Sequence, residues 1–317
     1  MGIRNFAAVA ALSVGLTATP VLAQDGAPRS FTMDGNWALD VGDDYCRLAA
    51  NFANGDDVIA FALEKNRAEN FARLVLVGEA IRPYRGAQGL GYSYLPDHAE
   101  RNAQILRSET GDGRPYFNLG NVVFGPDPFA NMGEGSGGPA MAAAGDDAAG
   151  FVIPTYDREA ELAFAATVNG IELTTGLRDP IRIETGSLRA PVQALQACAD
   201  DLLLVWGLDY EAHKSMTRRA APSEPAYEWL SGNTFGFQDF PLLAGGNNVV
   251  RVMVNAEGKP TDCAVHWPTL AERKNAAICE GIMENGDFEP ALDANGNAMA
   301  SYWMVDPIFN LTRPFGR

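Results

Sequence analysis

Basic side chains are scarce in this sequence. Among 317 residues, 24 Lys and Arg stand against 40 Asp and Glu, and the formal net charge is −16. Nucleic-acid binding relies on clustered Lys and Arg that contact phosphates, so this balance argues against a nucleic-acid partner. The acidity favours solubility, and it leaves open an acidic face for a basic partner.

Long apolar runs are also few. Residues 6–19 are apolar, but a membrane-spanning helix needs about 20 such residues. Because Arg4 precedes this run and small side chains follow it, the pattern is typical of a secretory signal cleaved after Ala23. Residues 1–23 are therefore expected to be a signal peptide, and the mature chain to be soluble, periplasmic and not stably inserted in a membrane.

The four cysteines include no C-x-x-C pair. The three histidines lie far apart in the sequence, at His98, His213 and His266. This spacing gives no metal site, and no cofactor motif is present. An even number of cysteines in an exported protein favours disulfides. Of the three pairings that four cysteines allow, chain position favours one bridge in each of two domains, Cys46–Cys198 and Cys263–Cys279.

A catalytic set of nucleophile, base and acid is missing. The run around Ser136, GEGSGGPA, is similar to the nucleophile loop of trypsin-like proteases, but Gly135 replaces the expected Asp. His98 lies too near Ser136 in the sequence for the His–Asp–Ser order of these proteases. Residues 125–150 are therefore expected to form a surface loop. His266 is alone on the second face of a strand and is expected to be structural. Catalysis is not expected, and a hydrolase using Ser136 or His266 remains a minor alternative.

Residues 24–207 predict an α+β domain that is rich in strands and closed by one helix. Strands are expected at residues 57–65, 72–78, 104–107, 121–124, 160–169, 171–175 and 180–184. From Leu188, apolar residues recur every three or four positions, which predicts a helix with Ser187 as its N-cap. The acidic cluster Asp40, Asp43 and Asp44 predicts a solvated turn rather than a cation site.

Residues 208–228 are polar, include two prolines, and predict a linker. Within them, a basic spot comprises His213, Lys214, Arg218 and Arg219. This basic spot is expected to be solvated rather than to form a binding patch. Residues 229–317 predict a small second domain. Its expected elements are a helical turn in the FPLLAGG run, strands at 250–254 and 263–267, a helix from 270 to 285 with Cys279 and Met283 on its inner side, a turn at 293–296 and a last strand at 299–311.

This second domain resembles the TonB C-terminal domain family. The resemblance rests on VVRVMVNAEGKPTDCAV, a helix containing Cys279, the run DFEPALDANGN, and a closing strand. It covers about 70 residues and implies a ββαβ module with a helix on one face of a small sheet. In the family, the last strand pairs with a peptide segment of an outer-membrane receptor. The corresponding residues here are Ser301, Tyr302, Trp303, Met304 and Val305, because Pro307 interrupts the ladder beyond them.

The family's energy transducers carry a membrane anchor and a Pro- and Lys-rich rod. Here a signal-like start and a globular acidic domain occupy those places. We therefore expect a soluble periplasmic protein of a Gram-negative type that binds a protein partner, such as an outer-membrane or envelope protein, without catalysis. The alternatives are a TonB-type energy transducer and, on the structural side, a homodimer formed through an exposed edge strand.

Overall fold

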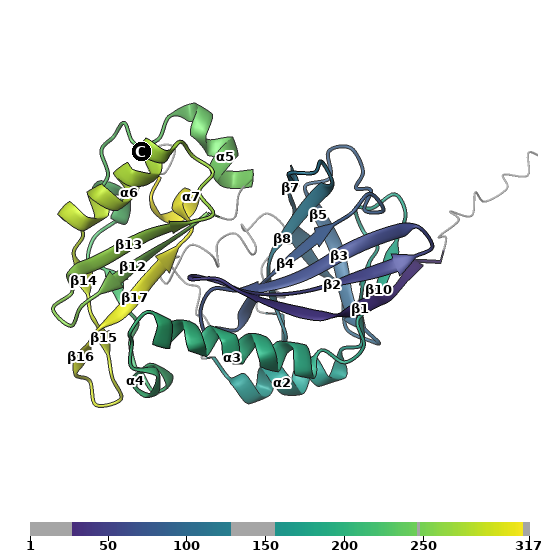
Figure 1. Ribbon diagram of the computed structural model, residues 1–317, viewed down its shortest axis with the longest axis horizontal. Helices are drawn as coiled ribbons and strands as arrows, with labels where there is room; N and C mark the ends of the chain where they lie inside the picture. The colour runs from purple at the N-terminus through teal and green to yellow at the C-terminus, as the bar shows by residue number, and fades with distance from the viewer. Residues whose placement is uncertain (1–26, 128–155, 246–247, 313–317) are drawn as a thin grey trace, which may run out of the picture.

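The structure is a computed structural model that describes residues 27–127, 156–245 and 248–312 (Figure 1). The expected signal, residues 1–23, and Ser136 lie outside these ranges. Within them, none of the helices combines the length and apolarity that a bilayer crossing requires. The described chain is α+β, as the sequence predicts, with a large strand-rich sheet and few helices.

Ten strands form the N-terminal sheet, in the spatial order β6-β5-β9-β10-β1-β2-β3-β4-β8-β7. Their bounds are β1 (Arg29–Val41), β2 (Cys46–Asn54), β3 (Asp57–Lys65), β4 (Phe71–Val77), β5 (Gly89–Leu95), β6 (Arg101–Gln104), β7 (Leu106–Glu109), β8 (Pro115–Val123), β9 (Gly170–Leu173) and β10 (Ile181–Glu184). Neighbouring strands are antiparallel except β1 and β10, which are parallel.

The sheet is nearly closed, because its two ends approach each other. β6 and β7 lie at opposite ends of the strand order, yet only Ile105 separates them in the chain. The guanidinium of Arg101 on β6 donates to the carbonyls of Val123 and Gly125, at 2.8 and 2.5 Å, at the end of β8. The single strand expected at 104–107 is therefore the junction of two strands, and the one expected at 121–124 is the end of β8.

The closed sheet encloses a core made by alternate residues of its strands. On β2, for example, Leu48, Ala50 and Phe52 are buried, as a side-chain period of two requires. Helix α3 (Arg189–Val205) packs against β1, β2 and β3, and α2 (Arg158–Thr167) lies beside it (Figure 1). Two helices, and not the one expected, thus close this domain.

Helix α2 replaces the strand predicted at residues 160–169, so that prediction is wrong. The side chain of Asp157 caps the helix by accepting from the amide of Ala160 at 3.0 Å, and Glu159 and Glu161 occupy the first turn. These residues favour a helix N-terminus, and the following run is rich in alanine, the strongest helix former. The apolar alternation that suggested a strand is outweighed by these local preferences.

Helix α3 confirms the predicted apolar stripe, since Val192, Leu195 and Leu202 are all buried. Its N-cap position is Leu188, which makes no side-chain cap, so the assignment of Ser187 as N-cap is wrong. The Ser187 hydroxyl accepts only a long 3.4 Å bond from the amide of Arg189. The predicted Cys46–Cys198 disulfide is present, with a Cα–Cα distance of 6.0 Å, and joins β2 to α3.

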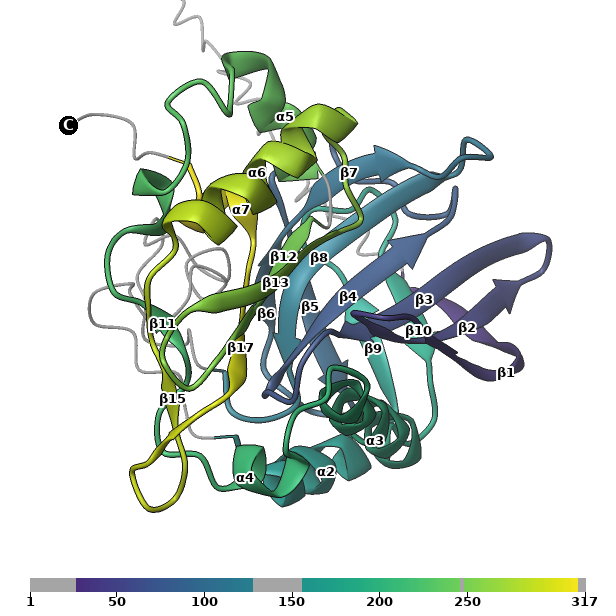
Figure 2. The same cartoon turned by 60° about the vertical axis from the view of Figure 1, so that its left-hand side comes forward.

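The C-terminal part contains a three-stranded antiparallel sheet in the order β13-β12-β17. Its strands are β12 (Val249–Val254), β13 (Pro260–His266) and β17 (Ser301–Val305), and α6 (Glu272–Asn285) packs on one face (Figure 2). The predicted Cys263–Cys279 disulfide joins β13 to α6. Met283 is 39% exposed, which corrects its expected place on the inner side of the helix.

The last strand is shorter than predicted. β17 ends at Val305, and Pro307 begins the short helix α7 (Pro307–Asn310), because proline is well suited to the first position of a helix. Before β17, the hairpin β15 (Ala291–Leu292) and β16 (Ala298–Met299) encloses the predicted turn. In this turn the Asp293 carboxylate accepts from the amides of Asn295 and Asn297, both at 2.8 Å.

The segment expected as a linker carries regular structure. It contains α4 (Tyr210–Lys214), β11 (Ala221–Pro222) and the 3-10 turn η1 (Ala226–Glu228). β11 pairs with β14 (Phe288–Glu289), so the segment adds to the C-terminal part. A second 3-10 turn, η2 (Phe237–Asp239), leads into α5 (Phe240–Gly245), the helical turn expected in the FPLLAGG run.

Candidate functional site

The second face of the C-terminal sheet packs against the N-terminal domain. Tyr302 and Met304 of β17 form a small apolar cluster with Leu203 and Leu208, which lie at and beyond the end of α3. The indole of Trp206 contacts Tyr302 edge to face, with ring centroids 4.9 Å apart. The three-stranded sheet is therefore covered on both sides, by α6 on one face and by the first domain on the other.

A buried ion pair holds this junction together. The Nε of Arg251 on β12 donates to the carboxylate of Asp44 at 2.5 Å, and their side chains are 11% and 7% exposed. The same guanidinium lies over the ring of Trp206, at 5.2 Å from the centroid. The expected solvated turn is found at Asp43, which is exposed; Asp40 is exposed but lies in β1, and Asp44 is buried, so the expectation is wrong for these two residues.

His266 belongs to an aromatic contact at the same junction. Its ring lies 4.9 Å from that of Tyr45 and 3.8 Å from that of Trp267. The guanidinium of Arg47 stacks over Trp267 at 5.1 Å. Burial lowers the pKa of His266 below its ordinary value, so the neutral ring is favoured. This imidazole packs between Tyr45 of the N-terminal part and Trp267 of the C-terminal part.

The predicted binding strand, β17, occupies one edge of the C-terminal sheet. All five of its residues, Ser301–Val305, are buried. Trp303 packs in the core beneath α6, whereas Tyr302 and Met304 point toward the first domain. Arg67 donates to the carbonyl of Met304 at 2.6 Å. Within the described part of the chain, no strand pairs with the other long side of β17.

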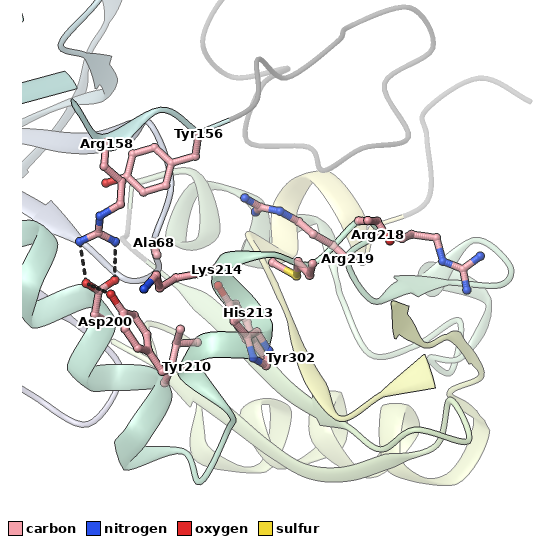
Figure 3. A pocket seen from close by; sticks show the side chains of 13 residues that line it. Ala68, Tyr156, Arg158, Asp200, Tyr210, His213, Lys214, Arg218, Arg219 and Tyr302 are labelled. Atoms are coloured by element: carbon pink, nitrogen blue, oxygen red, sulfur yellow. Dashed lines mark hydrogen bonds and ion pairs between the residues drawn. The ribbon is translucent and has the colours of Figure 1, made fainter. Parts of the chain in front are cut away.

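A pocket of about 460 Å³, which we call the junction pocket, lies where the two domains meet (Figure 3). No pattern in the sequence predicts this pocket. Its walls come from the loop after β3, from α2 and α3, from α4 with the segment after it, and from β17. The lining residues are Ala68, Tyr156, Arg158, Asp200, Leu203, Tyr210, His213, Lys214, Met216, Thr217, Arg218, Arg219 and Tyr302.

One wall of the junction pocket is held by paired hydrogen bonds. Arg158 on α2 makes two bonds of 2.6 Å to the carboxylate of Asp200 on α3, and the Tyr210 hydroxyl donates to the same carboxylate at 3.0 Å. Such bidentate arginine–carboxylate pairs are strong and fix geometry as well as charge. The three side chains therefore form a rigid surface across two helices and the start of a third.

A buried polar network supports the neighbouring wall. The amine of Lys65, which is fully buried, binds both carboxylate oxygens of Glu161 at 2.7 and 3.0 Å. Gln196 and the hydroxyl of Tyr156 donate to the same carboxylate at 2.6 and 2.9 Å. Burial lowers the pKa of Lys65 and, with the nearby Glu161 charge, raises the pKa of Tyr156. The network anchors Tyr156 in the pocket lining.

His213 connects α4 to β17 beneath the pocket. Its Nδ1 lies 2.7 Å from the carbonyl of Asp209, and because a carbonyl only accepts, Nδ1 carries the proton. Its Nε2 lies 3.0 Å from the Ser301 hydroxyl, and the Tyr302 ring is stacked on it. Burial lowers the pKa of His213 from its ordinary value. The expectation that the basic spot is solvated is therefore wrong for His213.

The other members of that basic spot line the pocket from α4 and the segment after it. Lys214 pairs with the exposed Glu211 at 3.1 Å. Arg218 binds the carboxylate of Glu289 at 3.1 Å, and in Figure 3 it extends away from Arg219, which reaches toward the side of Arg158. These charges form a group in the sequence, but the pocket that they line also includes residues as distant in the chain as Ala68 and Tyr302.

The residues described by the structure offer no group of three or more His, Cys, Asp or Glu arranged to hold a metal ion. Comparisons of the chain with protein-family models, with curated proteins and with solved structures find no match. The function is therefore inferred from the geometry of the chain's own residues.

Proposed function

We propose that this protein is an exported, non-catalytic binding protein of the periplasm whose TonB-like C-terminal module contacts a protein partner along the edge of β17. The partner is an outer-membrane or envelope protein that supplies an extended segment. Main-chain hydrogen bonds between that segment and β17 provide affinity, and alternate side chains provide selectivity. The two disulfides support export, because such bonds persist in oxidising compartments.

The observation that carries this proposal is the position of β17. It is an edge strand of the β13-β12-β17 sheet, and its second long side has no strand partner among the described residues. Burial of Ser301–Val305 on both faces holds the strand in place, so little conformational entropy remains to be lost on pairing. Because Arg67 occupies the Met304 carbonyl, the partner is expected to pair with the first half of the strand.

Site-specific photo-crosslinking tests the proposal. Benzoyl-phenylalanine is placed at Ala300, an exposed residue directly before β17, or at Ala276, an exposed residue on α6 that serves as the matched control. After irradiation in envelope extract, we expect a discrete cross-linked partner from position 300 and none from position 276. Equal products from both positions, or none from position 300, would show the proposal to be wrong. Light scattering on the purified chain distinguishes a self-associated dimer from a foreign partner.

A further inference from the structure

The side chains that line the junction pocket are mostly cationic, whereas the chain as a whole is acidic. Four of its lining side chains are cationic, namely Arg158, Lys214, Arg218 and Arg219, and one, Asp200, is a carboxylate. The lining thus has an excess of three positive charges in a chain of net charge −16. A concave surface lined by one sign of charge concentrates ligands of the opposite sign.

Arg219 is the cation that is least satisfied by the protein itself. Its nearest carboxylate is Glu69 at 3.8 Å, and that carboxylate is already held by Arg67 at 2.7 Å. Arg219 makes no hydrogen bond to another described residue, and its side chain is 35% exposed. Arg158, Arg218 and Lys214, by contrast, each pair with a carboxylate more closely, at 2.6, 3.1 and 3.1 Å. The Glu69 carboxylate therefore lies near two guanidiniums, those of Arg67 and Arg219, at this edge of the pocket.

The other residues that line the pocket suit a ligand with an apolar or aromatic body. Leu203 and Met216 are aliphatic, and Tyr210 and Tyr302 present aromatic rings to the same space. A volume of about 460 Å³ lies within the range of about 300–1,000 Å³ typical of small-molecule sites. Because the bonds between Arg158, Asp200 and Tyr210 hold one wall rigid, that wall needs no reordering when a ligand enters.

We propose that the junction pocket binds a small organic anion, with its charged group on Arg219 and Lys214 and its apolar or aromatic body between the tyrosine rings. This site goes beyond protein contact along β17 and does not depend on it. The guanidinium of Arg219 offers planar donors for a carboxylate or phosphate, and the amine of Lys214 offers a point charge in the same pocket lining.

Isothermal titration calorimetry of the full chain at low ionic strength tests the proposal. The probes are phenyl phosphate, benzylamine of similar shape but opposite charge, and inorganic phosphate, which lacks the ring. We expect phenyl phosphate to bind more tightly than inorganic phosphate, and benzylamine not to bind. Arg219→Gln should lower the affinity for phenyl phosphate by at least about tenfold, since it removes a charge-assisted hydrogen bond. Arg114→Gln, at an exposed ion pair with Asp112, should leave affinity unchanged.

Several results would overturn the proposal. These are no binding of phenyl phosphate to the unaltered chain, equal binding of benzylamine, equal binding of inorganic phosphate, or equal affinity in the Arg219 and Arg114 variants. Urea unfolding shows whether the Arg219 variant is folded, and if it is not, Lys214→Gln replaces it under the same criterion. Cross-linking from Ala300 is expected to be the same in these variants, so failure here is separable from failure of protein binding.

Discussion

The Asp44–Arg251 ion pair is expected to be a main determinant of how the two domains are held together. Both side chains are about nine-tenths buried, and the two residues are 207 positions apart in the chain. Removing one partner of a buried ion pair costs about 3–5 kcal/mol, because the other charge is left without compensation in a poorly solvated place. The expected loss is therefore a large fraction of the total stability of about 5–15 kcal/mol typical of a folded domain.

The two single substitutions are not expected to cost the same. Arg251→Met leaves the Asp44 carboxylate buried without its cation, so we expect a loss of about 4–5 kcal/mol in the free energy of unfolding. Asp44→Ala leaves Arg251 with a second carboxylate, Asp262, at 3.2 Å, and with the ring of Trp206. Asp262 is 60% exposed, so this compensation is partial and the expected loss is about 2–3 kcal/mol.

Urea unfolding of the two single variants and the double variant provides the measurement. In a double-mutant cycle the double variant should cost less than the sum of the singles by at least about 2 kcal/mol, since the second change removes no remaining pair. The control is Glu172→Ala, which breaks a more exposed pair with Arg182 and should cost about 1 kcal/mol or less. Losses below about 1 kcal/mol for both singles, or strict additivity, would refute this reasoning.

Two further predictions concern the disulfides and His213. Replacing both cysteines of Cys46–Cys198 by Ala should cost about 5 kcal/mol on the chain-entropy model, against about 3 kcal/mol for Cys263–Cys279, because the bridges close separations of 152 and 16 residues. Urea unfolding compares them, and the reverse order would contradict the prediction. Because burial lowers the pKa of His213 below 6.5, its contribution to stability is complete above about pH 6.5 and decreases as the pH falls through that value toward the folded pKa. His213→Gln should therefore lose less stability than the unaltered chain between about pH 7 and about pH 5, and identical losses would show that His213 does not contribute.

Patterns of short range predicted much of this fold. The strand at Asp57–Lys65 has the bounds expected from its β-branched and apolar residues, and the stripe on α3 is buried as its spacing requires. Both disulfides follow the predicted pairing. These features depend on side-chain periodicity and chain position, which the sequence states directly. The strand predicted at 160–169 failed for a local reason as well, since the Asp157 cap and the alanine run favour a helix.

For the candidate sites, the sequence and the tertiary structure each decided different features. The sequence by itself determined a strand with an alternating pattern near the C-terminus and an acidic chain with one basic spot, and the positions of its four cysteines favoured one of three possible pairings. Only the tertiary structure decided that Asp44 is buried against Arg251, that His213 contacts Ser301 of β17, and that the basic spot lines a pocket. The physical reason is that docking joins surfaces from distant parts of the chain, and no local period records which faces will meet.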